Sequence, residues 1–349
     1  MAPVTLQLSP NDAIVVGPPS VLSNWGFDLV RAAAEHVQAE IRLVDRNDDV
    51  EEIPTAPNRP RVFCLAQYPS PSLAAIIRGS RLPTIACLDE VIDAVRYLKE
   101  SLGCTFLEAL RAHTAAAAVC GAFFDNPSVL LVERRDDGTT GKIAGQMLDH
   151  LGLGMTLPAK QSLIEQFAGE SGAMAWPLER SLSRRVVGYL LPGKTSTIAA
   201  NEAAVIEQVL APMTRMSTTR YGGPICWPSS VFLFGDRPNE PAPLVADVTG
   251  AARIIFYGPY FHLPTGRWQA QVVLGFSHDI FGTPFSIEVH GTTLVAKAIV
   301  KPHGEGIFKA SFSMTHTRPQ DPLELRIRNE EGAIEGRIGL ARVQFFSKD

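Results

Sequence analysis

The sequence has few cysteines and no close pair of them. Its 349 residues include five scattered cysteines, an odd number without any C-x-x-C spacing. This usage fits neither a disulfide framework nor a zinc site, so we expect most of the cysteines to be small buried core residues. The sequence also has no His-Glu-x-x-His motif, no Gly-x-Ser-x-Gly motif and no cluster of metal ligands, and we expect no metal.

The sequence lacks a long apolar run and a strong charge of either sign. No apolar stretch approaches ~20 residues, and the N-terminus has neither a basic nor a long apolar region, so we expect a cytoplasmic protein without a transmembrane segment. The formal net charge of −4 gives no global attraction to nucleic acid, and we expect no nucleic-acid partner. The length favours two domains.

Short apolar runs alternate with longer helical patterns from Asp12 to about Gly154. Such alternation predicts parallel strands joined by crossover helices, an α/β domain. Helices are expected over Leu88 to Leu102 and Phe106 to Ala118. The expected strands are Ala13 to Val16, Ile41 to Val44, Val62 to Ala66, Thr84 to Leu88 and Val129 to Val132.

The pattern changes to period two after about Pro243. Gly and Pro clusters near Gly223 and Asp236 mark a boundary, which predicts domains over 1–222 and 240–349. Helices over Ala159 to Phe167 and Ala199 to Leu210 complete the first. The second has short alternating runs, clearest in Leu323 to Arg328, and is expected to be an antiparallel, jelly-roll-like β-sandwich.

The first expected strand leads through the turn Gly17-Pro18-Pro19-Ser20 into a helix that begins near Val21. Unpaired amide groups and the positive end of the helix dipole meet at such a turn, which suits a phosphate. The turn itself has no Lys or Arg. Ser20 is therefore interpreted either as a phosphate ligand or as the N-cap of the helix.

Three segments in order resemble a sulfotransferase of the P-loop-related fold, in a degenerate form. They are the turn with its helix, Val15 to Asn24; the strand and helix Pro83 to Leu98, where Asp89 and Tyr97 match the family pattern; and the strand, acidic turn and helix from Pro127 to Leu153. The resemblance implies a parallel-sheet fold and the cofactor 3'-phosphoadenosine 5'-phosphosulfate.

The resemblance also implies roles for individual residues. Gly17, Ser20 and Ser23 would hold the phosphosulfate, and Arg96 a phosphate. The sequence departs from the pattern at four positions: Pro19 stands for the loop cation, Val21 for a Gly, Leu88 for an Arg and Arg96 for a Ser. Each charge-assisted phosphate contact that is lost removes ~1.5–3 kcal/mol of binding.

Two residues are candidates for assisting an acceptor hydroxyl. Asp89 follows an apolar strand, where open α/β sheets bind ligands, although it is equally suited to cap the helix that follows. His113 lies on the Ala-rich helix and is suited either to a catalytic base or to a solvated helix position. A formal nucleotide-loop match at Gly188 to Thr195 is more simply an exposed turn.

The segment Tyr257 to Trp268 contains Gly-Pro-Tyr and Leu-Pro-x-Gly turns between expected strands. It resembles β-sandwich modules of bacterial glycan-related proteins. Tyr257, Tyr260, His262 and Trp268 have the chemistry for sugar contacts, since aromatic rings stack on C–H faces and polar groups meet hydroxyls. The alternative is that these side chains fill the sandwich core or its corners.

Two functions follow. The first is a sulfotransferase-like protein of bacterial surface-polysaccharide metabolism, which transfers sulfate to a sugar hydroxyl. The second is a non-catalytic glycan-binding or polysaccharide-assembly protein that has lost cofactor binding. Both imply a glycan or polysaccharide partner.

Overall fold

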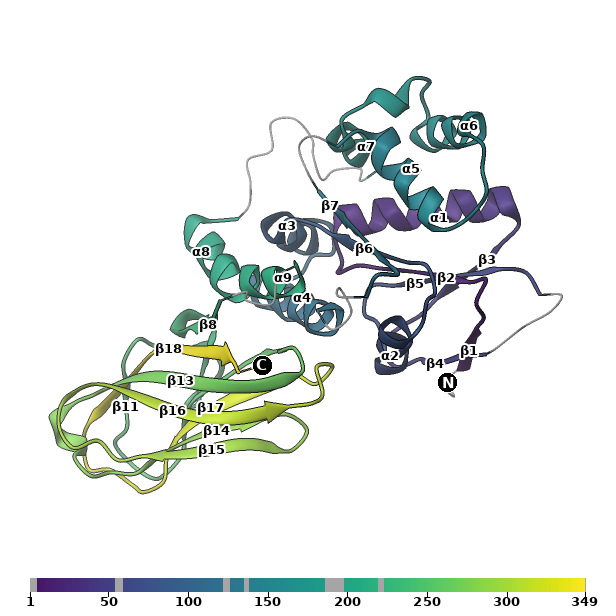
Figure 1. The fold of residues 1–349 in the computed structure, drawn as a ribbon. Coiled ribbons are helices and arrows are strands. Elements are labelled where there is room, and N and C mark those ends of the chain that lie inside the picture. Colours follow the sequence, from purple (N-terminus) through teal and green to yellow (C-terminus); the bar gives the residue numbers. More distant parts are fainter. Residues whose placement is uncertain are drawn as a thin grey trace. The chain divides into compact units, whose positions relative to one another are not determined.

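The computed structural model describes residues 5–53, 59–121, 126–134, 138–185, 198–218 and 223–348. Backbone contacts divide the chain into two compact units, Met1–Ala199 and Ala200–Asp349. The first is an α/β unit built on a parallel sheet, and the second consists mainly of antiparallel strands (Figure 1). The predicted fold class is confirmed.

The first unit contains a five-stranded parallel sheet in the order β3-β5-β2-β6-β7. Every strand lies within one residue of its predicted range. Burial on both faces explains the continuous apolar runs, because helices cover a sheet of this kind on each side. The strands are β2 (Ala13–Val16), β3 (Glu40–Leu43), β5 (Val62–Ala66), β6 (Thr84–Leu88) and β7 (Val129–Glu133).

Helices pack on both faces of this sheet (Figure 1). One core joins Val15, Phe63 and Ile85 to α1 (Val21–Val37), α5 (Thr140–His150), α6 (Leu157–Ala168) and α7 (Leu178–Arg185). The other joins Ile14 and Cys64 to α2 (Pro71–Gly79) and the end of α4 (Phe106–Cys120). Helix α3 (Val91–Ser101) packs on α4, and the 3-10 turn η1 spans Ala173–Ala175.

A separate two-stranded parallel sheet pairs β1 (Thr5–Leu8) with β4 (Asp49–Glu52). Neither strand is predicted from the sequence. The reason is that β4 has one buried residue, Val50, among exposed acidic ones, so it has no apolar run to detect. The acidic turn of the third resemblance segment, residues 135–137, and the nucleotide-loop match at residues 188–195 lie outside the described residues.

The second unit begins with two helices, α8 (Ala200–Val209) and α9 (Ala211–Thr218), and α8 lies against strand β8 (Ile225–Pro228). Turn chemistry predicts a boundary at residue 222, whereas the contacts divide the chain before α8. The reason is that the buried Ile206, Val209 and Leu210 give these helices an apolar face. Among the described residues, no helix has the length and hydropathy to cross a membrane.

Two antiparallel sheets form the sandwich. One has the order β10-β9-β12-β17-β14-β15, and the other β11-β18-β13-β16 with β8 also paired to β18. The strands are β9 (Leu233–Phe234), β10 (Arg237–Pro241), β11 (Ala246–Asp247), β12 (Ile254–Phe261), β13 (Gly266–Phe276), β14 (Phe285–His290), β15 (Leu294–Val300), β16 (Gly306–His316), β17 (Leu323–Asn329) and β18 (Arg337–Ser347), with 3-10 turns η2 (Ser229–Val231) and η3 (His278–Ile280).

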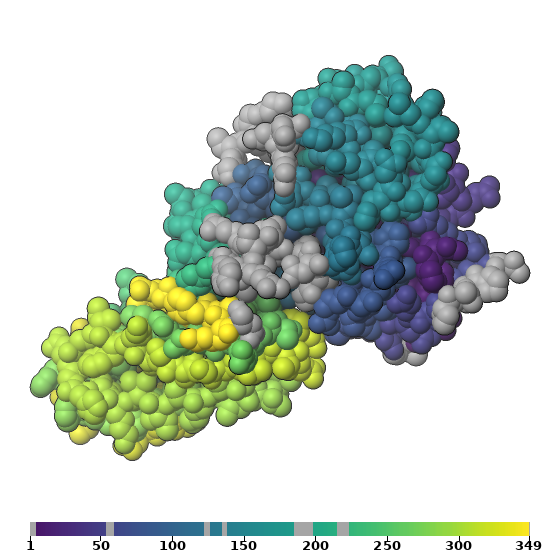
Figure 2. All heavy atoms as spheres, viewed as in Figure 1, coloured from purple at the N-terminus to yellow at the C-terminus, as the bar shows by residue number. Residues whose placement is uncertain are grey.

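Alternate side chains of these strands point into the sandwich. Along β13 every second residue is buried, which is the period-two pattern expected for strands with one solvated face. Trp227 packs edge-on against Phe261 and tilted against Phe345. Trp227, Trp268 and Phe345 are fully buried between the sheets, and Figure 2 shows the outer surface of this unit in green to yellow.

Candidate functional sites

The turn Gly17–Ser20 connects β2 to α1 at the carboxyl edge of the parallel sheet. Strand β2 lies between β5 and β6, and the chain goes from β2 outward to β3 on one side and later to β6 and β7 on the other. Ligands of open α/β sheets bind where the strand order reverses in this way. The turn is therefore at the position that the sequence analysis predicts for a phosphate loop.

The turn is closely packed and uses its own polar groups. A Cβ added to Gly17 would lie 2.4 Å from Ser23 Oγ, so only glycine fits. Ser20 caps α1, since its Oγ accepts the Ser23 N–H at 3.1 Å, which confirms the capping alternative. Ser20 Oγ also donates to Ser23 Oγ, and Ser23 Oγ donates to the Pro18 carbonyl at 2.7 Å. Both hydroxyls are engaged within the turn.

Asp89 occupies the position at the start of α1 that suits an anion. Its Oδ2 accepts the backbone N–H of Leu22, in the first turn of α1, at 3.1 Å. Its Oδ1 accepts the N–H of Glu90 at 3.0 Å. The expectation that Asp89 caps its own helix is wrong, because the N-cap of α3 is Glu90 and makes no side-chain capping bond. Asp89 instead accepts a backbone N–H at the start of α1, from a residue 67 positions earlier in the sequence.

Arg134 pairs with the buried Asp89. Burial raises the pKa of Asp89, and Arg134 opposes this effect with Nη1 at 3.3 Å from Oδ1. The same guanidinium lies 2.8 Å from Asp93 Oδ2 and donates from Nε to Glu179 at 2.9 Å. The sequence analysis assigns no role to Arg134. The strand-end rule that selects Asp89 would also have selected Arg134, because it directly follows β7.

Arg96 faces a carboxylate in the structure. Its Nη1 lies 2.8 Å from Asp93 Oδ1, so Asp93 bridges Arg96 and Arg134. The group thus joins two guanidiniums to three carboxylates, those of Asp89, Asp93 and Glu179. These five side chains carry a formal net charge of −1, which disfavours a polyanion beside them.

The cofactor implied by the resemblance, 3'-phosphoadenosine 5'-phosphosulfate, does not fit the residues of this turn. The turn has no cation, its serine hydroxyls are engaged internally, and the Asp89 carboxylate holds the Leu22 amide of α1. An entering sulfate or phosphate would meet the negative charge of Asp89 at that amide. No reaction step is derived through this cofactor.

His113 lies in the middle of α4 and is 4% exposed. Burial lowers its pKa to about 4, and its Nδ1 has no hydrogen-bond partner. The ring is therefore neutral at neutral pH. The expectation of a solvated helix position is wrong for His113, because the side chain is buried on the inner side of the helix. The role of a catalytic base stays a prediction.

Tyr257 and Tyr260 lie together on the outer face of the sheet containing β12. Their rings make a T-shaped pair with centroids 6.4 Å apart, and both side chains are partly exposed. The Tyr257 hydroxyl accepts the N–H of Asn239 at 2.9 Å, and the Tyr260 hydroxyl donates to Glu324 at 3.1 Å. Burial and Glu324 raise the pKa of Tyr260 to about 12.

Charged side chains continue across the same face from Tyr257. The strand register places Arg326 beside Tyr257, Glu288 beside Arg326, and Lys297 beside Glu288. Lys297 Nζ lies 2.8 Å from Glu288, and Arg326 lies 2.6 Å from Glu324. This face therefore has an aromatic pair at one side and a row of alternating charges beside it.

Trp268 and His262 do not share this surface. Trp268 is 1% exposed in the sandwich core, and its indole N–H donates to the Pro264 carbonyl at 3.1 Å. His262 is buried, with Nδ1 3.0 Å from the Pro319 carbonyl. The prediction of sugar contacts is corrected for these two, because strand alternation turns Trp268 inward. Trp268 and His262 fit the alternative that these side chains fill the sandwich core or its corners.

The part of the chain that the structure describes contains no group of three or more His, Cys, Asp or Glu side chains that could hold a metal ion. The charged clusters in both units pair acids with guanidinium or ammonium groups instead.

No family model matches the sequence, and no curated protein matches it. Among solved structures, the chain is similar to mouse sulfotransferase SULT7A1 complexed with PAP, at 12% identity and a TM-score of 0.39, over 61% of this chain and 90% of that one. It is also similar to carbohydrate-binding module CBM36 in complex with calcium and xylotriose, at 8% identity and a TM-score of 0.25, over 35% and 98%. The xylan-binding module CBM15 matches at 8% identity and a TM-score of 0.27, over 36% of this chain and 99% of that one. All three likenesses are distant.

Proposed function

We propose that this chain is a non-catalytic glycan-binding protein, and that the outer face around Tyr257 and Tyr260 contacts the sugar. The observation that carries the proposal is the partly exposed tyrosine pair with both hydroxyls held in place. The wider role, in bacterial surface-polysaccharide assembly in the cytoplasm, belongs to the same proposal and rests on the resemblances in the sequence.

The tyrosine pair has the properties of a sugar platform. Its hydrogen bonds fix the rings before a ligand arrives, so little side-chain entropy is lost on binding. Tyr260 also has a φ of 67°, in the left-handed region that non-glycine residues seldom adopt. Such backbone strain is concentrated at ligand sites, where it directs a side chain that a relaxed backbone would turn elsewhere.

The neighbouring charged row supplies the polar half of such a site. A sugar presents hydroxyls that both donate and accept, and Glu324, Arg326 and Glu288 offer acceptors and donors side by side. A glycan lying across β12, β17 and β14 would stack on the tyrosines and exchange hydrogen bonds with this row. Acids and bases alternate here, so a neutral oligosaccharide suits the face.

A glycan array followed by calorimetric titration tests the proposal. The full chain is compared with the double variant Tyr257→Ala, Tyr260→Ala and with Phe281→Ala, a control that removes another exposed aromatic side chain of the same unit. The double variant is expected to bind at least tenfold more weakly, about 1.4 kcal/mol, as for aromatic residues central to an interface. Equal binding by the wild type and the double variant would contradict the proposal.

Sulfate transfer to a sugar hydroxyl is the competing function. It requires 3'-phosphoadenosine 5'-phosphosulfate, whereas the filled position at the start of α1 supports a protein without it. Calorimetric titration with 3'-phosphoadenosine 5'-phosphate separates the two. We expect no heat at millimolar ligand, and saturable heat from the wild-type chain would favour the transferase instead.

A further inference from the structure

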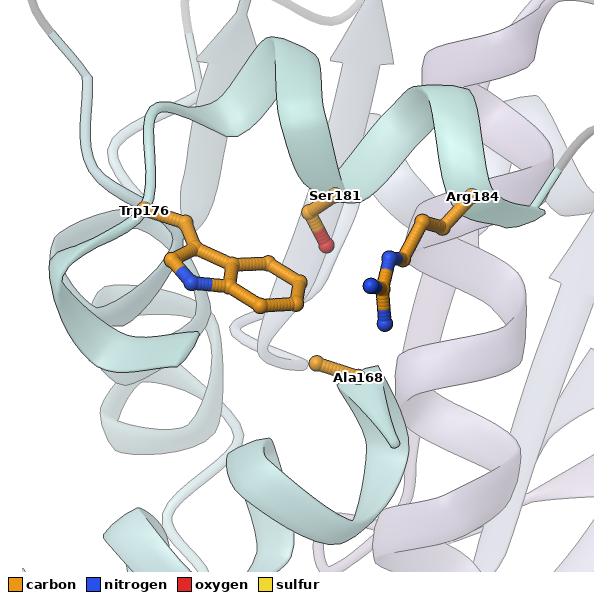
Figure 3. Close-up of a pocket in the computed structure, with 4 residues that line it drawn as sticks. All are labelled: Ala168, Trp176, Ser181 and Arg184. Atoms are coloured by element: carbon orange, nitrogen blue, oxygen red, sulfur yellow. The ribbon is translucent and has the colours of Figure 1, made fainter. Parts of the chain in front are cut away.

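A cavity of about 280 Å³ opens in the first unit. Among the described residues it is lined by Ala168 at the end of α6, Trp176 after η1, and Ser181 and Arg184 on α7. Figure 3 shows the indole of Trp176 and the guanidinium of Arg184 on opposite sides of the cavity, with the Ser181 hydroxyl directed into the same space.

The polar groups of this cavity are donors. Ser181 Oγ accepts the indole N–H of Trp25 at 2.9 Å, which leaves its O–H hydrogen to donate. The guanidinium of Arg184 has only donors. A ligand group that satisfies both must therefore be an acceptor, and a charged acceptor makes the stronger bonds.

The charges around the cavity also favour an anion. Arg180 and Arg184 lie one helical turn apart, and both have their guanidinium groups over the Trp176 ring, at 3.9 Å and 4.9 Å from its centroid. Among the described residues, the Glu170 carboxylate pairs with both, at 3.1 Å and 2.7 Å. These three side chains carry a formal net charge of +1, and an incoming anion can share Arg184 with Glu170.

We infer that this cavity binds an anionic sugar unit, with its sulfate or carboxylate group on Ser181 and Arg184. The volume is slightly below the ~300–1,000 Å³ typical of ligand pockets, which suits one ring with one charged substituent better than a nucleotide. The choice of a sugar as the carrier rests on the proposed function. The site itself does not, since it lies in the other unit.

Calorimetric titration of the full chain with four small probes tests this site. The probes are N-acetylglucosamine 6-sulfate, glucuronic acid, uncharged N-acetylglucosamine and adenosine 3',5'-bisphosphate. At least one acidic sugar is expected to bind tenfold or more tightly than the uncharged one. Arg184→Gln is expected to remove this preference. Arg180→Gln is the matched control, because Arg180 shares the Glu170 and Trp176 contacts but does not line the cavity.

A second variant is expected to strengthen binding. Glu170→Gln removes the carboxylate that competes for Arg184, so the acidic sugar should bind several-fold more tightly. Four results would overturn the inference: no binding of either acidic sugar at millimolar concentration, equal affinity for the uncharged sugar, binding of the bisphosphate alone, or equal losses in Arg184→Gln and Arg180→Gln.

The same titrations in the Tyr257→Ala, Tyr260→Ala background separate this site from the face in the second unit. Loss of array binding with unchanged acidic-sugar binding supports both sites as independent. Binding of neutral glycans that survives in this background contradicts the proposed function alone, whereas the Arg184→Gln result decides the cavity alone.

Discussion

Replacing Asp89 tests whether a carboxylate of the protein takes the place of a bound anion at the start of α1. The Asp89 carboxylate is buried and accepts the Leu22 amide at 3.1 Å. Asp89→Ala removes the acceptor and the charge together. Asp89→Asn keeps an acceptor oxygen of the same reach and removes only the charge, so it is the matched control.

Three contributions set the size of the effect. A charge-assisted bond to a buried amide contributes about 1.5–3 kcal/mol, and a negative charge at a helix N-terminus adds about 0.3–1 kcal/mol. Removing the carboxylate also removes the cost of burying its charge, which offsets part of both contributions, since burial raises the pKa of Asp89. Arg134 keeps its contacts with Asp93 and Glu179 in either variant. We therefore expect a loss of about 2 kcal/mol for Asp89→Ala and about 1 kcal/mol or less for Asp89→Asn.

Amide hydrogen exchange gives a local measurement in a chain of two units, where a single unfolding midpoint is poorly defined. A loss of 2 kcal/mol corresponds to about 30-fold faster exchange for the peptide that contains Leu22, if exchange proceeds by local opening. Asp89→Asn should exchange within about fivefold of the wild type. Wild-type exchange rates in Asp89→Ala would refute the interpretation that Asp89 holds this amide.

Two further substitutions test the packing of the first unit. Gly17→Ala brings a Cβ to 2.4 Å from Ser23 Oγ, so we expect the free energy of unfolding in urea to fall by about 1–3 kcal/mol. The control Gly79→Ala places its Cβ where no atom lies within 4 Å, and it should not lower the stability. Equal stability of the two variants would contradict the close packing at Gly17. The depressed pKa of His113, about 4 in the folded chain, means that the unfolded chain binds more protons between about pH 4 and 6.5, so the stability present above pH 6.5 is lost as pH falls toward 4. His113→Leu should remove about 2.4 kcal/mol of this pH dependence, measured as the difference in urea unfolding between pH 7 and pH 4.5.

Much of the fold follows from the sequence because burial leaves a periodic trace. The central strands β2, β5 and β6 are buried on both faces and are therefore continuous apolar runs. Strand β13 is buried on one face and alternates. Strand β4 carries no such trace, since its exposed residues outnumber its single buried one, and sequence reasoning missed it.

The candidate sites follow from the sequence less completely. The position of the turn at Gly17 could be predicted, because a strand, a glycine and a helix cap are local features. The partner of that turn could not, since Asp89 reaches Leu22 only through the neighbouring strand β6. The cavity at Trp176 was missed for a similar reason: its residues come from α6, α7 and the turn between them, and no local motif joins them.

Hydrophobic periodicity in the sequence is enough to predict a parallel α/β unit followed by an antiparallel sandwich, because it records which sides of an element face a core. Which polar groups face one another depends on the folded chain. The fold assigned the Asp89 carboxylate to the start of α1, turned Trp268 into the core and left Tyr257 and Tyr260 on the outer face. Periodicity specifies burial, whereas pairing between distant residues depends on strand order and register, which are settled only when the whole sheet assembles.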